Sequence, residues 1–170
     1  MARYRIVPER SHVYIDAKSS LHPIHSTTDG LEGLVEFEFG SDGEVDLSNK
    51  PVGKLSLAVT KLSSGNRMED RELHKRIDSR RFPTIEGVLD QMEPAGKEAY
   101  QVTGEITFRG VTKTHQDQMT IHVADEQTIE LEGKSRFDIR EFGMEPPKML
   151  MLKVDPEVDV RVDIIAVKEG

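Results

Sequence analysis

The stretch YQVTGEITFRGVTKTHQDQMTIHV, from Tyr100 to Val123, decides the fold class of this chain. Apolar residues alternate with polar ones up to the Arg109-Gly110 pair, and after that pair the apolar residues resume on the opposite parity. An alternation with a period of two is typical of a β-strand with one buried face, and a glycine between two such runs predicts a hairpin. We therefore expect a long antiparallel hairpin with one apolar face.

The same alternation fills most of the remaining chain. Six further segments carry it, namely 12–20, 31–39, 54–62, 84–92, 128–139 and 157–168. Turns that contain Gly, Pro or Asp lie between the segments, and no parallel crossover is evident. Short connections favour antiparallel pairing, so we expect eight or nine strands in an antiparallel barrel or sandwich.

One segment, SGNRMEDRELHKRIDSRRFP beginning at Ser64, breaks this pattern. Met68, Leu73 and Ile77 fall at roughly helical spacing, and either Ser64 or Asn66 is suited to be the N-cap. Acidic residues follow the cap and basic residues end the segment, an order that complements the helix dipole. We expect one short helix of about two to three turns.

The composition limits the partners and the compartment. At 170 residues the chain fits a single domain, residues 1–170. Its 31 acidic and 23 basic residues give a net charge of −8, which disfavours nucleic acid as a partner. The absence of cysteine excludes disulfides, thiolate metal sites and a Cys nucleophile.

No run is apolar and long enough for a membrane segment, and the first residues lack the apolar core of a signal peptide. We therefore expect a cytoplasmic protein. A homodimer is possible.

The inward-facing residues decide whether such a barrel is solid or hollow. Many are Val, Ala, Gly or Thr, aromatic residues make up only 5% of the chain, and Trp is absent. An eight-stranded barrel is either just filled by its side chains or wide enough for one slender ligand. Met149 and Met151, which share a face of KMLMLKV, are suited to contact an irregular apolar shape. Two interpretations remain open at this point, a filled core and a cavity that holds an apolar ligand.

Residues able to do chemistry are present, but in no familiar arrangement. His22 and His25 are spaced like a metal-binding pair, yet Pro23 argues against the helix that would bring them together, and no third ligand stands at a suitable spacing. We therefore expect no metal site. The sequence contains no nucleophile elbow, catalytic triad or phosphate loop. For an enzyme that used the cavity, the least poor candidates for the acid–base groups are His22 and Glu141.

Basic residues gather toward the end of the expected helix, between Arg71 and Arg81. One interpretation is a receptor for an anionic head group such as a diphosphate. The other, which we favour, is a solvated helix face with interleaved acidic residues. Arg140 follows an expected strand, and we expect it to be partly buried and paired with Asp138 or Glu141.

Several stretches resemble, in the correct order, motifs of the YceI-like family. YRIVPERSHVYIDAKSSLHPIHSTTDGLEGLVEFEF is similar to its opening strands, including His22 and the turn at Gly33. LSSGNRMEDRELHKRIDSRRFPTIEG resembles its Gly-Asn, helix and Phe-Pro-Thr-Ile segment. VTGEITFRGVTK resembles its Gly-x-Leu-Thr-x-x-Gly-Val-Thr-Lys hairpin, and FDIREFGM its Arg-x-x-Phe-Gly element. Tyr4 stands where the family usually has Trp, and the other departures cluster around the helix.

This resemblance implies an all-β, lipocalin-like antiparallel barrel of about eight strands with one short helix. It also implies that the barrel binds a long isoprenoid, such as a polyprenyl phosphate or a quinone, with no other cofactor and no enzymatic activity. Many members of the family are exported to the periplasm. We expect an isoprenoid-binding protein. The alternatives are an enzyme, an isomerase or hydrolase, that acts on a hydrophobic substrate in the same cavity, and a filled-barrel structural or stress-response interaction domain.

Two sets of residues form the expected binding site. The apolar side chains expected to line the lumen are Phe37, Leu57, Ile85, Ile106, Phe108, Met119, Ile121, Phe137, Met149 and Met151. The polar side chains expected at a head group or at the mouth are His22, Asn66, Arg71 and Arg140. An apolar tail inside the barrel would gain roughly 0.8 kcal/mol for each buried methylene.

Overall fold

Antiparallel β-strands make up most of this computed structural model, which describes residues 1–146, 148–149 and 152–170. The strands are β1 (Ala2–Ile6), β2 (His12–Ser19), β3 (Ile24–Thr28), β4 (Leu31–Phe37), β5 (Val52–Ala58), β6 (Thr84–Gly96), β7 (Ala99–Phe108), β8 (Val111–Val123), β9 (Thr128–Asp138), β10 (Lys148–Met149) and β11 (Leu152–Lys168). The helices are α1 (Arg67–Ile77) and the 3-10 turns η1 (Pro8–Arg10), η2 (Val59–Lys61) and η3 (Ile139–Phe142).

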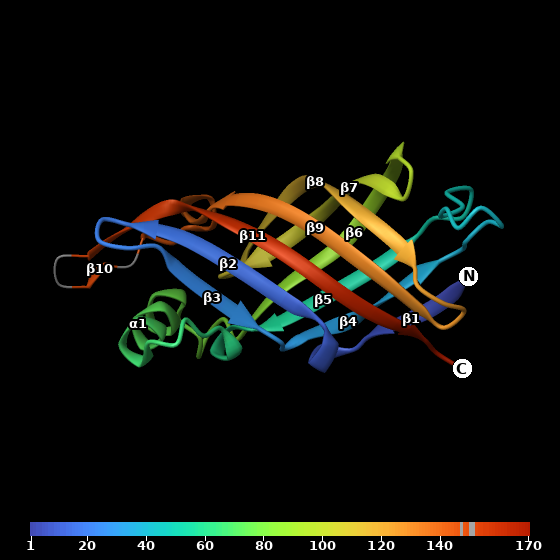
Figure 1. The fold of residues 1–170 in the computed structure, drawn as a ribbon. Coiled ribbons are helices and arrows are strands. Elements are labelled where there is room, and N and C mark those ends of the chain that lie inside the picture. Colours follow the sequence, from blue (N-terminus) through green and yellow to red (C-terminus); the bar gives the residue numbers. More distant parts are fainter. Residues whose placement is uncertain (147, 150–151) are drawn as a thin grey trace.

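Eight of these strands close into a barrel. The order is β1-β4-β5-β6-β7-β8-β9-β11, and β1 closes the ring because it pairs with both β4 and β11. Strand β11 is long enough to pair with β2 from Val154 to Asp163 before it pairs with β1 from Ala166 to Lys168. The β2–β3 hairpin therefore extends the wall beyond β1, toward the end where α1 lies (Figure 1). The expected antiparallel barrel with one α-helix is confirmed.

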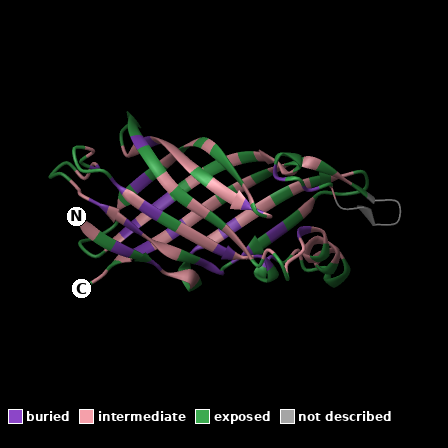
Figure 2. Ribbon diagram, turned by 180° about the vertical axis from the view of Figure 1, so that it is seen from behind, coloured by how far each residue is buried: buried purple, intermediate pink, exposed green. Residues whose placement is uncertain are grey.

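The hairpin predicted from Tyr100 to Val123 is β7–β8. Its turn residues Arg109 and Gly110 have φ of 52° and 73°, the pair of positive values that a two-residue type I′ hairpin turn requires. The alternation of buried and exposed residues runs along the barrel strands, and Figure 2 shows it as coloured bands. The period of two in the sequence is therefore the inward–outward alternation of the wall.

Side chains fill the end of the barrel that lies away from α1. Residues 40–50, drawn in teal in Figure 1, and both termini lie at this end. Tyr4 packs edge-on against Phe39, with ring centroids 6.0 Å apart, and both join a buried cluster with Val45 and Tyr100. The Tyr100 hydroxyl donates to Glu44 Oε2 (2.6 Å) and accepts from the Val45 backbone N–H (2.8 Å). Burial, with the Glu44 carboxylate, raises the pKa of Tyr100 to about 12.

Helix α1 covers the other end. Its N-cap is Asn66, one of the two residues expected for this role. The helix ends at the C-cap Asp78, which has the left-handed conformation (φ 62°). Leu73 and Ile77 face the barrel and contact its hydrophobic clusters. None of the helices in the described part of the chain combines the length and the apolar character needed to cross a membrane.

Tyr100→Phe should destabilise the protein by about 1–2 kcal/mol, because the buried Val45 N–H loses its acceptor and Glu44 loses a donor. Urea unfolding followed by circular dichroism measures this change. The matched control is Tyr14→Phe, since the Tyr14 ring lies over Arg161 and no described group bonds its hydroxyl; we expect a change below about 0.5 kcal/mol there. Equal effects at the two positions would contradict the role given to the Tyr100 hydroxyl.

The Tyr100 hydroxyl should also make stability depend on alkaline pH. Its pKa in the folded state is about 12, above the ordinary 10.0, so the unfolded chain loses this proton first as pH rises. The contribution is complete below pH 10 and is lost as pH passes through 12. The stability difference between the wild type and Tyr100→Phe should therefore narrow over this range in urea unfolding, and a constant difference would count against the assignment.

Candidate ligand-binding cavity

An elongated cavity of about 410 Å³ runs inside the barrel. On β11 it is lined by every second residue from Val158 to Ile164, with Val154 further toward the α1 end. At about 3.3 Å per residue, the lining from Val154 to Ile164 extends for about 33 Å along this strand. The cavity does not reach Tyr4 or Tyr100, because the packed end of the barrel stops it. The barrel is therefore hollow over much of its length and blocked at one end.

Missing side-chain volume explains why the barrel is hollow. Gly53, Gly87 and Gly133 line the cavity from three different strands. A Cβ built on Gly87 would lie 3.4 Å from the Ile106 side chain and 3.9 Å from that of Leu55, which is ordinary contact, so a side chain can start there without displacing a neighbour. Most other lining residues are Val, Ile or Leu, which reach only part of the way across an eight-stranded barrel.

The predicted apolar residues lie mostly where the alternation placed them. Eight of them line the cavity: Phe37, Leu57, Ile85, Ile106, Phe108, Met119, Ile121 and Phe137. Met151 lies outside the described residues; Met149 belongs to β10, but its side chain is outside the described part. The prediction left out the wall formed by β2 and β11, although Val13, Ile15 and the valines of β11 show the same alternation.

A second hollow of about 340 Å³, the portal pocket, lies between the β2–β3 turn and the start of α1. It is lined by His22, Pro23, Ile24, His25, Ser64, Gly65, Asn66 and Glu69. Ile24, Ser64 and Glu69 also line the main cavity, so the two spaces adjoin. His22 Nε2 lies 3.7 Å from Glu69 Oε1, and the Asn66 side chain accepts from the N–H groups of Met68 (3.0 Å) and Glu69 (3.2 Å). Two of the four predicted polar residues are therefore at an opening.

The two predicted arginines are not at the cavity. Arg71 is exposed and lines neither space. The face of α1 that lines the cavity is formed by Asp70, Leu73 and Ile77. Arg71 directly follows Asp70 and therefore lies on a different face of the helix. Arg140 pairs with Asp138 at 2.6 Å as expected, but its side chain is 60% exposed, so the expectation of partial burial is wrong. Glu141 is exposed as well and lines neither space.

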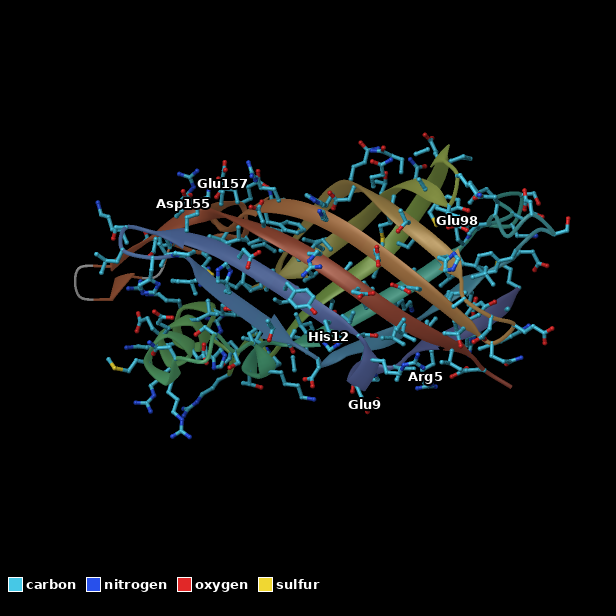
Figure 3. All side chains as sticks on the ribbon, viewed as in Figure 1. Arg5, Glu9, His12, Glu98, Asp155 and Glu157 are labelled. Atoms are coloured by element: carbon cyan, nitrogen blue, oxygen red, sulfur yellow. The ribbon has the colours of Figure 1, made fainter. Side chains whose placement is uncertain are left out.

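Charged side chains mostly project from the outer surface. Asp155 and Glu157, for example, point away from the barrel (Figure 3). On α1, Arg76 pairs with Glu72 at 3.0 Å, which matches the solvated-face interpretation of the basic residues. His25 bonds Asp16 at 2.6 Å whereas His22 contacts Glu69, and among the described residues neither histidine belongs to a cluster of three possible metal ligands.

A polar cluster that sequence reasoning missed lies in the cavity wall: His115, Asp117 and Ser135. His115 Nε2 is 2.6 Å from Ser135 Oγ and 2.8 Å from Asp117 Oδ2, and Ser135 Oγ donates to the same Oδ2 at 2.7 Å. Burial raises the pKa of Asp117, and the hydrogen bond from Ser135 opposes that rise. The signal was present in the opening stretch, because His115 and Asp117 share the parity of Met119 and Ile121.

The cluster sits where two strands stop pairing. Strands β8 and β9 are hydrogen-bonded only from Met119 to Val123 on β8, so 111–118 and 134–138 pair with their other neighbours alone. We call this unpaired stretch between β8 and β9 the seam. If the register continued, Asp117 would face Ser135, and His115 would face Phe137, whose ring it stacks on at 4.2 Å. Beyond the last backbone hydrogen bonds, the two strands are therefore joined by contacts between side chains that the register would place opposite each other.

The geometry of the cluster is not that of a catalytic triad. In a triad the carboxylate and the hydroxyl bond different nitrogens of the imidazole, so that a proton passes through the ring. Here Asp117 and Ser135 both contact Nε2 of His115. The arrangement gives hydrogen-bonding groups to a ligand but no relay for activating Ser135.

Asn66→Ala should lower the free energy of unfolding by about 1 kcal/mol, because two N–H groups at the start of α1 lose their acceptor. Asn66→Asp keeps a side-chain acceptor and should restore stability to within a few tenths of a kcal/mol. Urea unfolding of the three proteins measures this. If Asn66→Ala had the same free energy of unfolding as the wild type, the cap would not stabilise this wall of the portal pocket.

The comparisons with known proteins agree with this architecture. The family model of the YceI-like domain matches residues 4–166. BcnA of Burkholderia cenocepacia superposes with a TM-score of 0.78 at 16% identity, over 94% of this chain and 98% of that chain. A polyisoprenoid-binding domain from Saccharophagus degradans gives 0.78 at 9% identity, over 99% and 100%, and the Campylobacter jejuni YCEI protein gives 0.70 at 13% identity, over 85% of each.

No curated protein sequence matches the chain. At these low identities the structural neighbours establish the fold alone, while the family model extends over nearly the whole chain. The closed barrel and helix α1 agree with the match of the family model. This chain belongs to the YceI-like domain family.

Proposed function

We propose that this protein binds an isoprenoid-like lipid, of the polyprenyl or quinone type, with its apolar tail inside the barrel. The observation that carries the proposal is the elongated cavity, which is lined chiefly by Val, Ile, Leu, Met and Phe, blocked at one end and adjoined by the portal pocket at the other. Each methylene buried there is worth roughly 0.8 kcal/mol, so a tail supplies affinity without charged contacts.

The dimensions support a single slender ligand. Ligand pockets have volumes of roughly 300–1,000 Å³, and the main cavity has about 410 Å³. A cavity that follows β11 for many residues suits a long chain better than a compact ring system. Met92, Met119 and Met144 lie in its lining and can adapt to the methyl branches of a chain. The polyisoprenoid-binding domain from Saccharophagus degradans, which has the same fold, supports the same class of ligand.

The two alternative functions have weaker support. A filled structural barrel would leave no room for a ligand, whereas the cavity is large enough for one. The polar cluster places acid–base groups, His115 and Asp117, in the cavity wall, but its geometry provides no relay that would activate Ser135 as a nucleophile. We therefore favour a carrier or a sequestering protein over an enzyme.

Gly87→Leu tests the proposal by filling the cavity. An added Cβ at Gly87 meets only side-chain atoms, at ordinary contact distances, and Gly87 has no positive φ, so leucine projects inward without a backbone clash. Overpacking an occupied site costs about 1–3 kcal/mol, so lipid that co-purifies with the protein should fall about tenfold. Native mass spectrometry and solvent extraction of protein purified from cells measure this.

The matched control is Gln118→Leu, which adds leucine at an exposed position of β8 that does not line the cavity. It should keep the lipid content of the wild type. Circular dichroism and thermal unfolding establish that both variants are folded, and Val160→Phe fills the cavity from the opposite wall if Gly87→Leu does not fold. The proposal fails if added isoprenoids bind the wild type and the cavity-filled variant equally.

A further inference from the structure

We infer that the cluster of His115, Asp117 and Ser135 is the head-group site of the cavity, and that it selects an uncharged head group that donates a hydrogen bond, such as the hydroxyl of an isoprenoid alcohol or quinol. The inference rests on the proposed function and specifies the ligand further. The first observation is the position of the cluster: these three polar residues lie together in the mainly apolar lining of the cavity, at the seam between β8 and β9.

The hydrogen bonds inside the cluster fix which atoms remain for a ligand. Ser135 donates its proton to Asp117 Oδ2, so His115 Nε2 must carry a proton to bond these two oxygens. In a neutral imidazole the other nitrogen, Nδ1, is then an acceptor. Among the described residues no group bonds His115 Nδ1 or Asp117 Oδ1. Both atoms are acceptors, and Oδ1 of the carboxylate remains one even when the imidazole is protonated.

The surrounding charge excludes an anionic head group. Glu69 and Asp70 also line the cavity, so the carboxyl groups of its α1 end include these two and Asp117. Lys134 is the one Lys or Arg of the described lining, and it is exposed on the outer side of β9. The arginines expected to receive a phosphate, Arg71 and Arg140, lie outside the cavity. A phosphate would meet these carboxyl groups with no Lys or Arg in the cluster to pair with it, whereas a hydroxyl meets acceptors.

Stacking of His115 on Phe137 makes the site well defined. The ring centroids are 4.2 Å apart, and Phe137 also packs near Phe142, so the imidazole is held between an aromatic wall and its two oxygen partners. A preorganised acceptor loses little entropy when a ligand binds. The purely structural role, in which the cluster only joins β8 to β9 across the seam, makes a different prediction, because it would not distinguish between head groups.

The test compares three probes with one tail: geranylgeraniol, its methyl ether and its monophosphate. The ether keeps the acceptor oxygen of the alcohol but lacks the donor proton. Competition for the wild-type protein, measured by native mass spectrometry, should favour the alcohol over the ether by about tenfold, the effect of one hydrogen bond to a charged acceptor. The monophosphate should bind more weakly than both.

Asp117→Asn is the decisive variant. The amide oxygen can take the place that accepts from Ser135 and His115, which leaves the NH₂ group where the ligand meets Oδ1. The preference for the alcohol should then fall to within about twofold or reverse, while the ether keeps its affinity. Glu105→Gln is the control, because it removes one negative charge from an exposed position of β7 outside the cavity and should keep the preference.

The outcomes separate this inference from the proposed function. Equal binding of alcohol and ether by the wild type, or tighter binding of the monophosphate, would overturn the inference and leave lipid binding intact. If Asp117→Asn weakened the binding of the alcohol and of the ether equally, the cluster would only stabilise the contact between β8 and β9, and the inference would be wrong. If none of the three probes bound, the proposed function itself would fail.

Discussion

Closure of the sheet by β1 is the constraint on which the rest of the structure depends. Because β1 pairs with β4 on one edge and with β11 on the other, eight strands share one ring, and the number of strands sets its width. Every second residue must then point into an enclosed space. At the end away from α1, where Tyr4, Phe39 and Tyr100 come together, the space is filled. Toward α1, where most of the inward residues are Val, Ile, Leu or Gly, it stays open.

The walls of the cavity were largely predictable from the sequence, because inward orientation in a strand is a local property. Val102, Ile106 and Phe108 alternate as a β-strand must, and the positive φ values at Arg109 and Gly110 are those of a tight hairpin. The helix was predictable for the same reason, because its N-cap and the spacing of its apolar residues are features of one short segment.

The polar part of the site was not predictable in the same way, since it depends on long-range pairing. Asp117 and Ser135 meet because β8 and β9 share a register that begins at Met119 and Gly133. Arg71 and Arg140 were misjudged for a related reason, because a charge near an expected mouth carries no information on the direction of its side chain.

A high-resolution crystal structure of the protein as purified from cells tests the central claim most directly. The account predicts continuous, elongated electron density that belongs to no residue of the chain, running along the valines of β11 from the portal pocket toward the packed end. A barrel interior occupied by its own repacked side chains, with no space for a chain of carbon atoms, would contradict it.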